Sequence, residues 1–185
     1  MLDEILKDAE ERMKKSVENT RHELLTIRTG RATPTLLDGI KVEYYGSMVP
    51  LRQIANVVTP EARLIVVNPF DRSALASIEK AIIQANLGLN PMNDGNVIRI
   101  PIPPLTEERR KELVKIVHKL AEDGRVAIRN IRRDANDMIK ELKTNHEISE
   151  DEAELYLEKV QKLTDKYIEE INSMLKSKEK ELMEN

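Results

Sequence analysis

The 185-residue sequence predicts an α+β fold, in which a long antiparallel three-helix bundle carries a small inserted β/α/β domain. Apolar residues recur at steps of three and four along three long segments, which is the spacing of one buried helix face. The prolines and all but one of the six glycines lie between Gly30 and Leu105, where short β-branched runs alternate with turn residues. Helical segments therefore flank a strand-rich insertion.

The first predicted element is a helix over residues 1–29. Gly30 follows this segment and is expected to end the helix, because glycine readily adopts the left-handed conformation found after the last helical turn. The positions expected to form the buried face of this helix are Leu6, Ala9, Met13, Val17, Thr20, Leu24 and Ile27.

Residues 31–105 are predicted to form the inserted domain. Asp71 can cap a short helix, and residues 93–96 (Asn-Asp-Gly-Asn) are typical of a turn before the last strand. The apolar positions of the short helix are Leu75, Ile78 and Ile82. The expected strands are Gly39–Tyr45, Gln53–Val58, Arg63–Val67 and Val97–Ile102.

A second long helix is predicted to begin after the insertion. Thr106 is a suitable N-cap, and the charges of Glu107 and Glu108 suit the positive end of a helix. The apolar pattern continues to about residues 143–146, where the helix should end. Its expected buried positions are Leu113, Val117, Leu120, Gly124, Ile128, Ile131, Ala135, Met138 and Leu142.

The third long helix is predicted to begin at a capping box, in which Ser149 and Glu152 bond to each other's backbone N–H groups. Three helices with one apolar stripe each are stable only when packed together, so residues 1–30 and 106–185 should form one bundle domain. The expected buried positions of the third helix are Ala153, Tyr156, Val160, Leu163, Tyr167, Ile171, Met174 and Leu182.

The inserted domain is expected to join the bundle through two chain crossings. The first is Gly30-Arg31, and the second is Pro103-Pro104-Leu105. Since two crossings resist rotation weakly, these residues are candidates for a hinge. Arg28 and Arg31 flank Gly30, so they are either ordinary surface arginines beside a helix stop or a second phosphate contact beside the hinge.

The composition limits the function classes. The chain has no cysteine and a net charge of −3, and no apolar run approaches the roughly 20 residues that cross a bilayer. Its start is acidic and has no apolar core, unlike a secretory signal peptide. Charge is segregated: residues 106–143 hold 11 Lys and Arg against 8 Asp and Glu (net +3), and residues 144–185 hold 6 against 12 (net −6).

The candidate binding residues are arginines on the second long helix. At 100° per residue, Arg125, Arg129, Arg132 and Asn136 share one face, away from the apolar stripe. Arg125 can reach Glu122, and Arg133 can reach Asp137, whereas Arg129 and Arg132 have no acid three or four residues away.

Unpaired guanidinium groups on a rigid helix suit phosphate recognition, because their planar fork binds phosphate oxygens bidentately. The absence of interleaved aromatics indicates backbone and shape recognition of folded RNA. Two structural alternatives remain open: the face is merely solvated, or the acidic third helix neutralises the arginines.

The sequence gives little support for an enzyme. His22, His118 and His146 are scattered without metal-ligand spacing, and no nucleotide-binding glycine pattern occurs, so no cofactor, metal or catalytic residue is predicted. Tyr44 and Tyr45 are expected to pack on a strand, because successive strand residues face opposite sides. A helical scaffold or chaperone that binds proteins through a coiled-coil face is the main alternative to an RNA-binding protein.

Three long runs resemble the ribosome recycling factor family. They are residues 24–46 (LLTIRTGRATPTLLDGIKVEYYG), 87–115 (LGLNPMNDGNVIRIPIPPLTEERRKELVK) and 124–140 (GRVAIRNIRRDANDMIK), in the family's order and with essentially full-length coverage. The resemblance implies a three-helix bundle with an inserted β/α/β domain, L-shaped and similar in outline to transfer RNA.

The resemblance also implies a non-catalytic, monomeric cytoplasmic protein that binds large-subunit ribosomal RNA of the post-termination ribosome. With elongation factor G and GTP it would separate the subunits and free messenger RNA and deacylated transfer RNA. Salt-sensitive ribosome binding would distinguish it from a scaffold. The implied RNA contacts are Arg129, Arg132 and Arg133, followed by Arg125, Arg28 and Arg31. The implied hinge is Gly30, Arg31, Pro103, Pro104 and Leu105.

Overall fold

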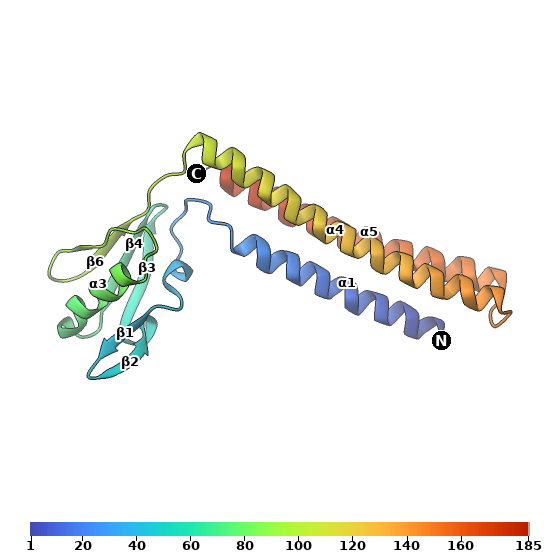
Figure 1. The fold of residues 1–185 in the computed structure, drawn as a ribbon, viewed down its shortest axis with the longest axis horizontal. Coiled ribbons are helices and arrows are strands. Elements are labelled where there is room, and N and C mark those ends of the chain that lie inside the picture. The colour runs from blue at the N-terminus through green and yellow to red at the C-terminus, as the bar shows by residue number, and fades with distance from the viewer. Residues whose placement is uncertain (185) are drawn as a thin grey trace. The chain divides into compact units, whose positions relative to one another are not determined.

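The computed structural model describes residues 1–184, which divide into two compact units (Figure 1). One unit comprises Met1–Arg28 and Thr106–Glu184 and contains three long helices. The other comprises Thr29–Leu105 and contains two small sheets and the helix α3, Leu75–Gln84. The predicted α+β fold class is confirmed. Within residues 1–184, no helix combines the length and apolar composition needed to cross a membrane.

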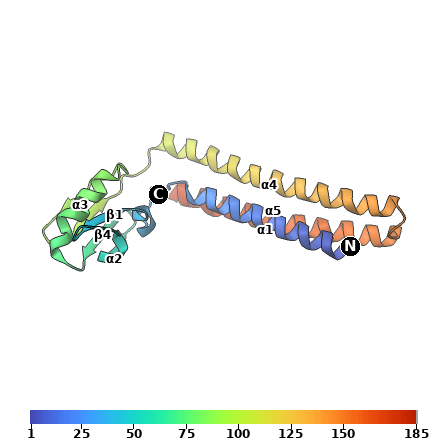
Figure 2. The same ribbon diagram turned by 60° about the horizontal axis from the view of Figure 1, so that its bottom comes forward.

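The first unit is a bundle whose helices lie side by side in both views (Figure 1, Figure 2). Helices α1 (Leu2–Leu25) and α5 (Glu150–Glu184) point the same way, and α4 (Glu107–Thr144) runs antiparallel to both. Each helix buries one apolar stripe against the other two, which stabilises helices that would be marginal alone. Side chains that are almost completely buried in this core include Met13, Ile128, Ile139 and Ile171.

Both predicted N-terminal caps of the later helices are confirmed. The Thr106 hydroxyl accepts a hydrogen bond from the Arg109 backbone N–H at 3.1 Å. At the start of α5, the Glu152 backbone N–H donates to the Ser149 hydroxyl at 3.1 Å, and the Ser149 N–H donates to the Glu152 carboxylate at 3.4 Å. This reciprocal pair satisfies two N–H groups that the helix leaves unbonded.

The end of the first helix differs from the prediction. α1 ends at Leu25, four residues before the predicted end, and Gly30 belongs to the smaller unit. The Thr26 hydroxyl donates to the Glu23 carbonyl at 2.6 Å, and the Thr26 backbone N–H also donates to this oxygen. A carbonyl of the last turn is thus satisfied before the glycine is reached.

The buried stripes follow the predicted faces with local errors. On α4, Ala121 and Ile139 are buried, whereas the predicted Leu120 is half-buried and Met138 is exposed. A step of three and a step of four residues both lead to a position near the buried face. Periodicity alone therefore does not tell which of two adjacent residues, such as Leu120 and Ala121, is the buried one. On α5, the prediction omits Thr164, which is fully buried with its hydroxyl donating to a backbone carbonyl at 2.8 Å.

The smaller unit contains two antiparallel sheets. One pairs β1 (Lys41–Tyr44) with β2 (Ser47–Pro50). The other has the strand order β3-β4-β6-β5. Its strands are β3 Ala55–Glu61, β4 Leu64–Pro69, β6 Ile98–Pro101 and β5 Met92–Asn93. Short helices precede or connect these elements: η1 Pro34–Leu37, α2 Leu51–Ile54 and η2 Arg72–Ala74. The buried side chains of β4, β6 and α3 form the middle of one core.

The four predicted strands are present with shifted bounds, but two further strands are missed. β2 contains a proline and lacks clear alternation, and β5 has two residues, so neither carries a recognisable pattern. Gln53, predicted in a strand, lies in α2.

The predicted cap and turn of the smaller unit are correct. Asp71 accepts a hydrogen bond from the Ser73 N–H at 2.9 Å, and Asp94 accepts from two backbone N–H groups at 2.8 Å. The N–H groups of Val97 and Asn96, with Arg99, lower the pKa of Asp94 to about 2.

The three helices of the bundle approach one another closely at Gly124, in the middle of α4. A Cβ atom at this position would lie 2.3 Å from the Thr20 hydroxyl oxygen on α1 and 3.0 Å from Ile171 Cδ1 on α5. The Thr20 hydroxyl is held in place, because it donates to the Ser16 carbonyl at 2.9 Å. The missing side chain therefore lets α1 and α5 approach α4 together at one level.

We expect Gly124→Ala to destabilise the protein, although alanine favours a helix over glycine by about 1 kcal/mol. The added methyl group would overlap the Thr20 hydroxyl and press on Ile171. The free energy of unfolding, measured by urea denaturation followed by circular dichroism, should fall by about 1–3 kcal/mol, as in other overpacked cores.

Thr20→Ala provides the control, because it removes the atom nearest to the added methyl group. The double variant should be more stable than the sum of the two single changes predicts. If the Gly124→Ala protein were more stable than the parent, the added methyl group would not force the helices apart, and the prediction would be wrong.

Candidate nucleic-acid interface

Helix α4 carries the four predicted arginines on its middle turns, opposite or beside its buried stripe. Arg129 and Arg133 are exposed, whereas Arg125 and Arg132 are half-buried at the edge that faces α5. The spacing of three and four residues places these groups along one side of a rigid helix. The predicted arginine face therefore exists, but Arg125 and Arg132 contact the neighbouring helix α5.

Arg125 is the most firmly held of the four. Its guanidinium forms an ion pair with Glu122 at 2.9 Å, as predicted, and its Nη1 donates to Asn172 Oδ1 of α5 at 2.8 Å. Only 16% of its side chain is exposed. Arg125 thus connects α4 to α5 and has fewer free donors than its neighbours.

The prediction that Arg129 has no acidic partner is wrong. Its Nη1 lies 3.1 Å from Glu122 Oε1, seven residues earlier on the same helix. Seven residues are close to two full turns, so two long side chains on one face can meet, although pairs at three or four residues are the usual ones. Hydrogen bonds from Arg125 first, and then from Arg129, lower the pKa of Glu122.

Arg132 and Arg133 have no carboxylate partner among residues 1–184. Arg132 Nη1 donates to Gln161 Oε1 of α5 at a long 3.4 Å. The predicted pairing of Arg133 with Asp137 is not formed, and the Arg133 side chain makes no hydrogen bond within the described residues. The nearby Asp134 pairs instead with Arg12 of α1 at 3.1 Å.

The acidic helix α5 does not neutralise the arginine face directly. It presents the neutral amides of Asn172 and Gln161 to Arg125 and Arg132. Gln161 in turn donates to Asp165 at 2.8 Å, which orients its carbonyl oxygen toward α4. Among the described residues, two of the four guanidinium groups share the carboxylate of Glu122 and the other two have no carboxylate partner, so the face keeps a net positive charge.

The two remaining predicted arginines lie near the boundary between the units. Arg28 is the last residue of the bundle's first segment, and Arg31 lies in the smaller unit. Both are exposed. Their neighbour Gly30 has φ +78°, a left-handed conformation that side chains disfavour.

The predicted hinge residues of the smaller unit are in contact with one another. A Cβ at Gly30 would lie 3.0 Å from Leu105 Cγ, so the two chain crossings run side by side. Just inside them, the Ala32 N–H donates to the Ala62 carbonyl at 2.7 Å, and the Ile102 N–H donates to the Arg63 carbonyl at 2.8 Å. Pro103 and Pro104, between these bonds and the bundle, have no N–H to donate.

The tyrosine pair differs from the prediction. Tyr45 is not in a strand: it occupies the two-residue turn between β1 and β2, with φ +49° and 82% exposure. The rings of Tyr44 and Tyr45 lie edge to face, with centroids 4.5 Å apart. The Tyr44 hydroxyl donates to Asp71 at 2.8 Å, and this bond is the main cause that raises the pKa of Tyr44 to about 12. Sequence patterns miss such a turn, because Asn or Gly is usual there.

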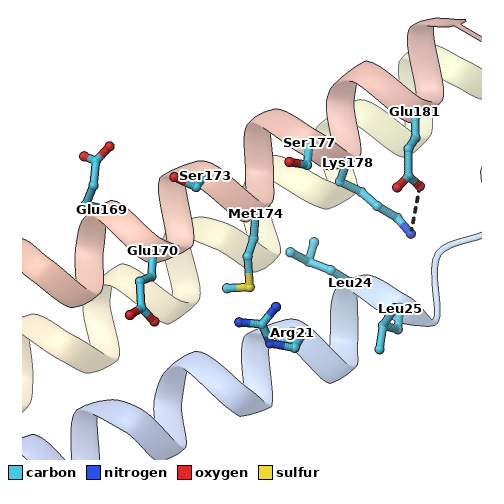
Figure 3. Close-up of a pocket in the computed structure, with 10 residues that line it drawn as sticks. All are labelled: Arg21, Leu24, Leu25, Glu169, Glu170, Ser173, Met174, Ser177, Lys178 and Glu181. Atoms are coloured by element: carbon cyan, nitrogen blue, oxygen red, sulfur yellow. Dashed lines mark ion pairs between the residues drawn. The ribbon is translucent and has the colours of Figure 1, made fainter.

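The hollow beside the end of α1 does not resemble a phosphate site. A hollow of about 560 Å³ lies between the end of α1 and α5 (Figure 3). Its cations are paired, Arg21 with Glu18 at 3.2 Å and Lys178 with Glu181 at 3.8 Å. His118 contacts Glu179, and within residues 1–184 no group of three His, Cys, Asp or Glu side chains could hold a metal ion.

Comparison with known proteins gives a consistent set of relatives. A family model described as "Ribosome recycling factor" matches residues 20–183. The ribosome-recycling factors of Halothermothrix orenii and Bacillus subtilis are 57% and 54% identical to this chain, each over 100% of both sequences.

Two solved structures resemble the whole chain. A solution structure of the ribosome recycling factor covers 100% of this chain and 98% of its own, with 52% identity and a TM-score of 0.77. The second has 49% identity, 98% coverage of each chain and a TM-score of 0.65. It describes the T. thermophilus ribosome recycling factor and the E. coli elongation factor G bound to the E. coli post-termination complex.

The backbone conformation at Gly30 predicts that any side chain at this position lowers the stability of the fold. Gly30→Ala should lower the free energy of unfolding by about 1–2 kcal/mol, because alanine disfavours the left-handed conformation. Its Cβ would also press on Leu105. Gly39→Ala serves as a comparison: φ is also positive there, but no atom lies within 4 Å of the added Cβ. Equal losses in thermal or urea unfolding would contradict a role for the Leu105 contact.

Proposed function

The chain belongs to the ribosome recycling factor family, and we propose that it acts in the cytoplasm as a monomer on the post-termination ribosome. With elongation factor G and GTP, it promotes dissociation of the subunits and release of messenger RNA and deacylated transfer RNA. The full-length similarity to a recycling factor described on the post-termination complex with elongation factor G carries this proposal. The chain itself performs no catalytic step, and GTP hydrolysis belongs to elongation factor G.

The α4 arginines are proposed to form the contact with large-subunit RNA. Arg132 and Arg133 have no carboxylate partner within the described chain, so their guanidinium groups are available to phosphate oxygens. Arg129 can exchange its shared Glu122 for a phosphate, while Arg125 fixes the edge of the face to α5. Further phosphate contacts are assigned to Arg28 and Arg31.

A division of labour between two domains is also proposed. The bundle, residues 1–28 and 106–184, binds RNA, and residues 29–105 receive the action of elongation factor G. The connecting residues Gly30, Arg31, Pro103, Pro104 and Leu105 act as the hinge. The paucity of backbone N–H groups at Pro103 and Pro104 supports this assignment, because few backbone bonds have to break when the crossings bend.

The proposed function is tested with purified components. Post-termination ribosomes carrying messenger RNA and deacylated transfer RNA are mixed with this protein, elongation factor G and GTP, and subunit separation is followed by light scattering. We expect dissociation when all components are present. Omitting the protein, or replacing GTP with a non-hydrolysable analogue, should prevent it. Dissociation independent of the protein would refute the proposal.

Arg132→Ala is the most direct test of the RNA-binding face. Its bond to Gln161 is long and its partner neutral, so the free energy of unfolding should change by no more than about 0.5 kcal/mol. Ribosome affinity should fall by roughly 1.5–3 kcal/mol, the range for hydrogen bonds to charged groups. The salt dependence of binding should become shallower, because fewer counterions are released.

Two variants serve as controls for Arg132→Ala. Arg132→Lys should recover part of the affinity, since an ammonium group keeps the charge but lacks the planar fork. Lys176→Ala removes an exposed cation from α5 and should leave binding unchanged. Loss of folding in Arg132→Ala, with normal affinity of the folded fraction, would assign the residue to the bundle instead.

Glu122→Gln is expected to have the opposite effect. It removes the carboxylate that Arg125 and Arg129 share, and so makes the face more positive. Ribosome affinity measured by filter binding should rise, and its salt dependence should become steeper. Glu158→Gln, an exposed acid on α5, supplies the matched change of charge. A weaker complex with Glu122→Gln would mean that Glu122 orients the arginines rather than competing with RNA.

A further inference from the structure

An apolar groove of about 490 Å³ lies between the start of α1 and the end of α4. Met1 and Ile5 line one wall, and Met138 and Leu142 line the other. Met1 is 67% exposed and Met138 is 45% exposed, although both are large and apolar. Methionine side chains are flexible and fit irregular shapes, so these walls can adapt to the shape of a segment that lies in the groove.

The rim of the groove is strongly acidic. Its charged side chains are Glu4 and Asp8 from α1 with Glu141 and Glu147 from the other side, and no Lys, Arg or His side chain lines it. Within residues 1–184 none of the four carboxylates forms an ion pair, whereas Glu10, Glu18 and other acids of the bundle do. The one cationic group that the lining residues contribute is the α-amino group of Met1.

We propose that this groove binds a segment of a ribosomal protein that is rich in lysine or arginine and partly apolar. The inference rests on the proposed function, which brings the bundle to the ribosome. The rim would repel RNA phosphates, because four unpaired carboxylates outnumber the single amino group. Cationic side chains would instead pair with the carboxylates and lay their aliphatic stems on the methionines. Within the described residues, the acids form no metal-binding group.

Helix α4 thereby carries two surfaces of opposite charge. Its arginines at positions 125–133 suit RNA, and its last turns at 138–142 suit a basic protein segment. In Figures 1 and 2, the start of α1 lies near the end of the bundle where α4 passes into α5. The groove would therefore contact protein while the middle of the same helix contacts RNA.

The sign of an affinity change tests the proposal. Glu4→Gln combined with Glu141→Gln removes one carboxylate from each wall, and binding to purified ribosomes is measured with a fluorescently labelled protein. We expect the Kd to rise roughly fivefold, as for the loss of two exposed ion pairs. An unchanged Kd would mean that the groove faces solvent, and a lower Kd would mean that it faces RNA. Either result overturns the proposal.

The control is Glu154→Gln combined with Glu158→Gln, which makes the same charge change at exposed positions of α5 outside the groove. This pair should leave the Kd within error of the parent, and thermal melting of both double variants should match the parent. A similar rise in Kd for both pairs would indicate a general charge effect and refute a specific site.

Site-specific cross-linking identifies the class of partner. A photoreactive benzophenone side chain at Met138 is activated on the purified ribosome complex, and the products are separated into protein and RNA. We expect attachment to a basic ribosomal protein, reduced by Glu4→Gln with Glu141→Gln. Attachment to RNA, or none on a bound complex, would overturn the inference and leave the proposed function intact. Failure of the parent protein to bind ribosomes would instead contradict the proposed function.

Discussion

The close approach of three helices at Gly124 sets the register of the bundle. Residues 29–105 separate α1 from α4 in the sequence, so no short connection fixes how α1 lies along its partners. The contact of Gly124 with Thr20 and Ile171 fixes that position, because any Cβ at this level would separate the helices. The apolar stripes above and below can then interlock, as tightly packed interiors require.

This register determines what α4 presents on its other sides. With one stripe buried against α1 and α5, the arginines fall on the surface and along the edge of α5, where Asn172 and Gln161 hold two of them. In the proposed contact with RNA, the packed helix would hold the backbone of these arginines in place, which lowers the loss of conformational freedom on binding. Glu122 moderates the charge of this face without cancelling it.

Much of the fold follows from local patterns in the sequence. The caps at Thr106 and Ser149 and the turn around Asp94 depend on a few neighbouring residues, and they are predicted correctly. The short strands β2 and β5 pair with the strands next to them in the sequence, β1 and β6, but they are missed because neither carries an alternating pattern of its own. For the arginine face, spacing predicts the shared side but misses the Glu122–Arg129 pair, because ion pairs on a helix are usually three or four residues apart and this one spans seven. The left-handed conformation of Tyr45 is missed because Asn, Asp or Gly usually occupies that turn position, and here only the next residue, Gly46, is of that kind.

The discontinuous bundle has a consequence for the order of folding. α4 and α5 are joined by the short connection at residues 145–149, so they can pair as a helical hairpin with little loss of chain entropy. α1 must find that hairpin across the whole smaller unit, which is a contact of long sequence separation and forms slowly. During synthesis, α1 leaves the ribosome first and its partners last. The apolar stripe of α1 therefore stays exposed to solvent until nearly the entire chain has emerged, whereas residues 29–105 can fold earlier.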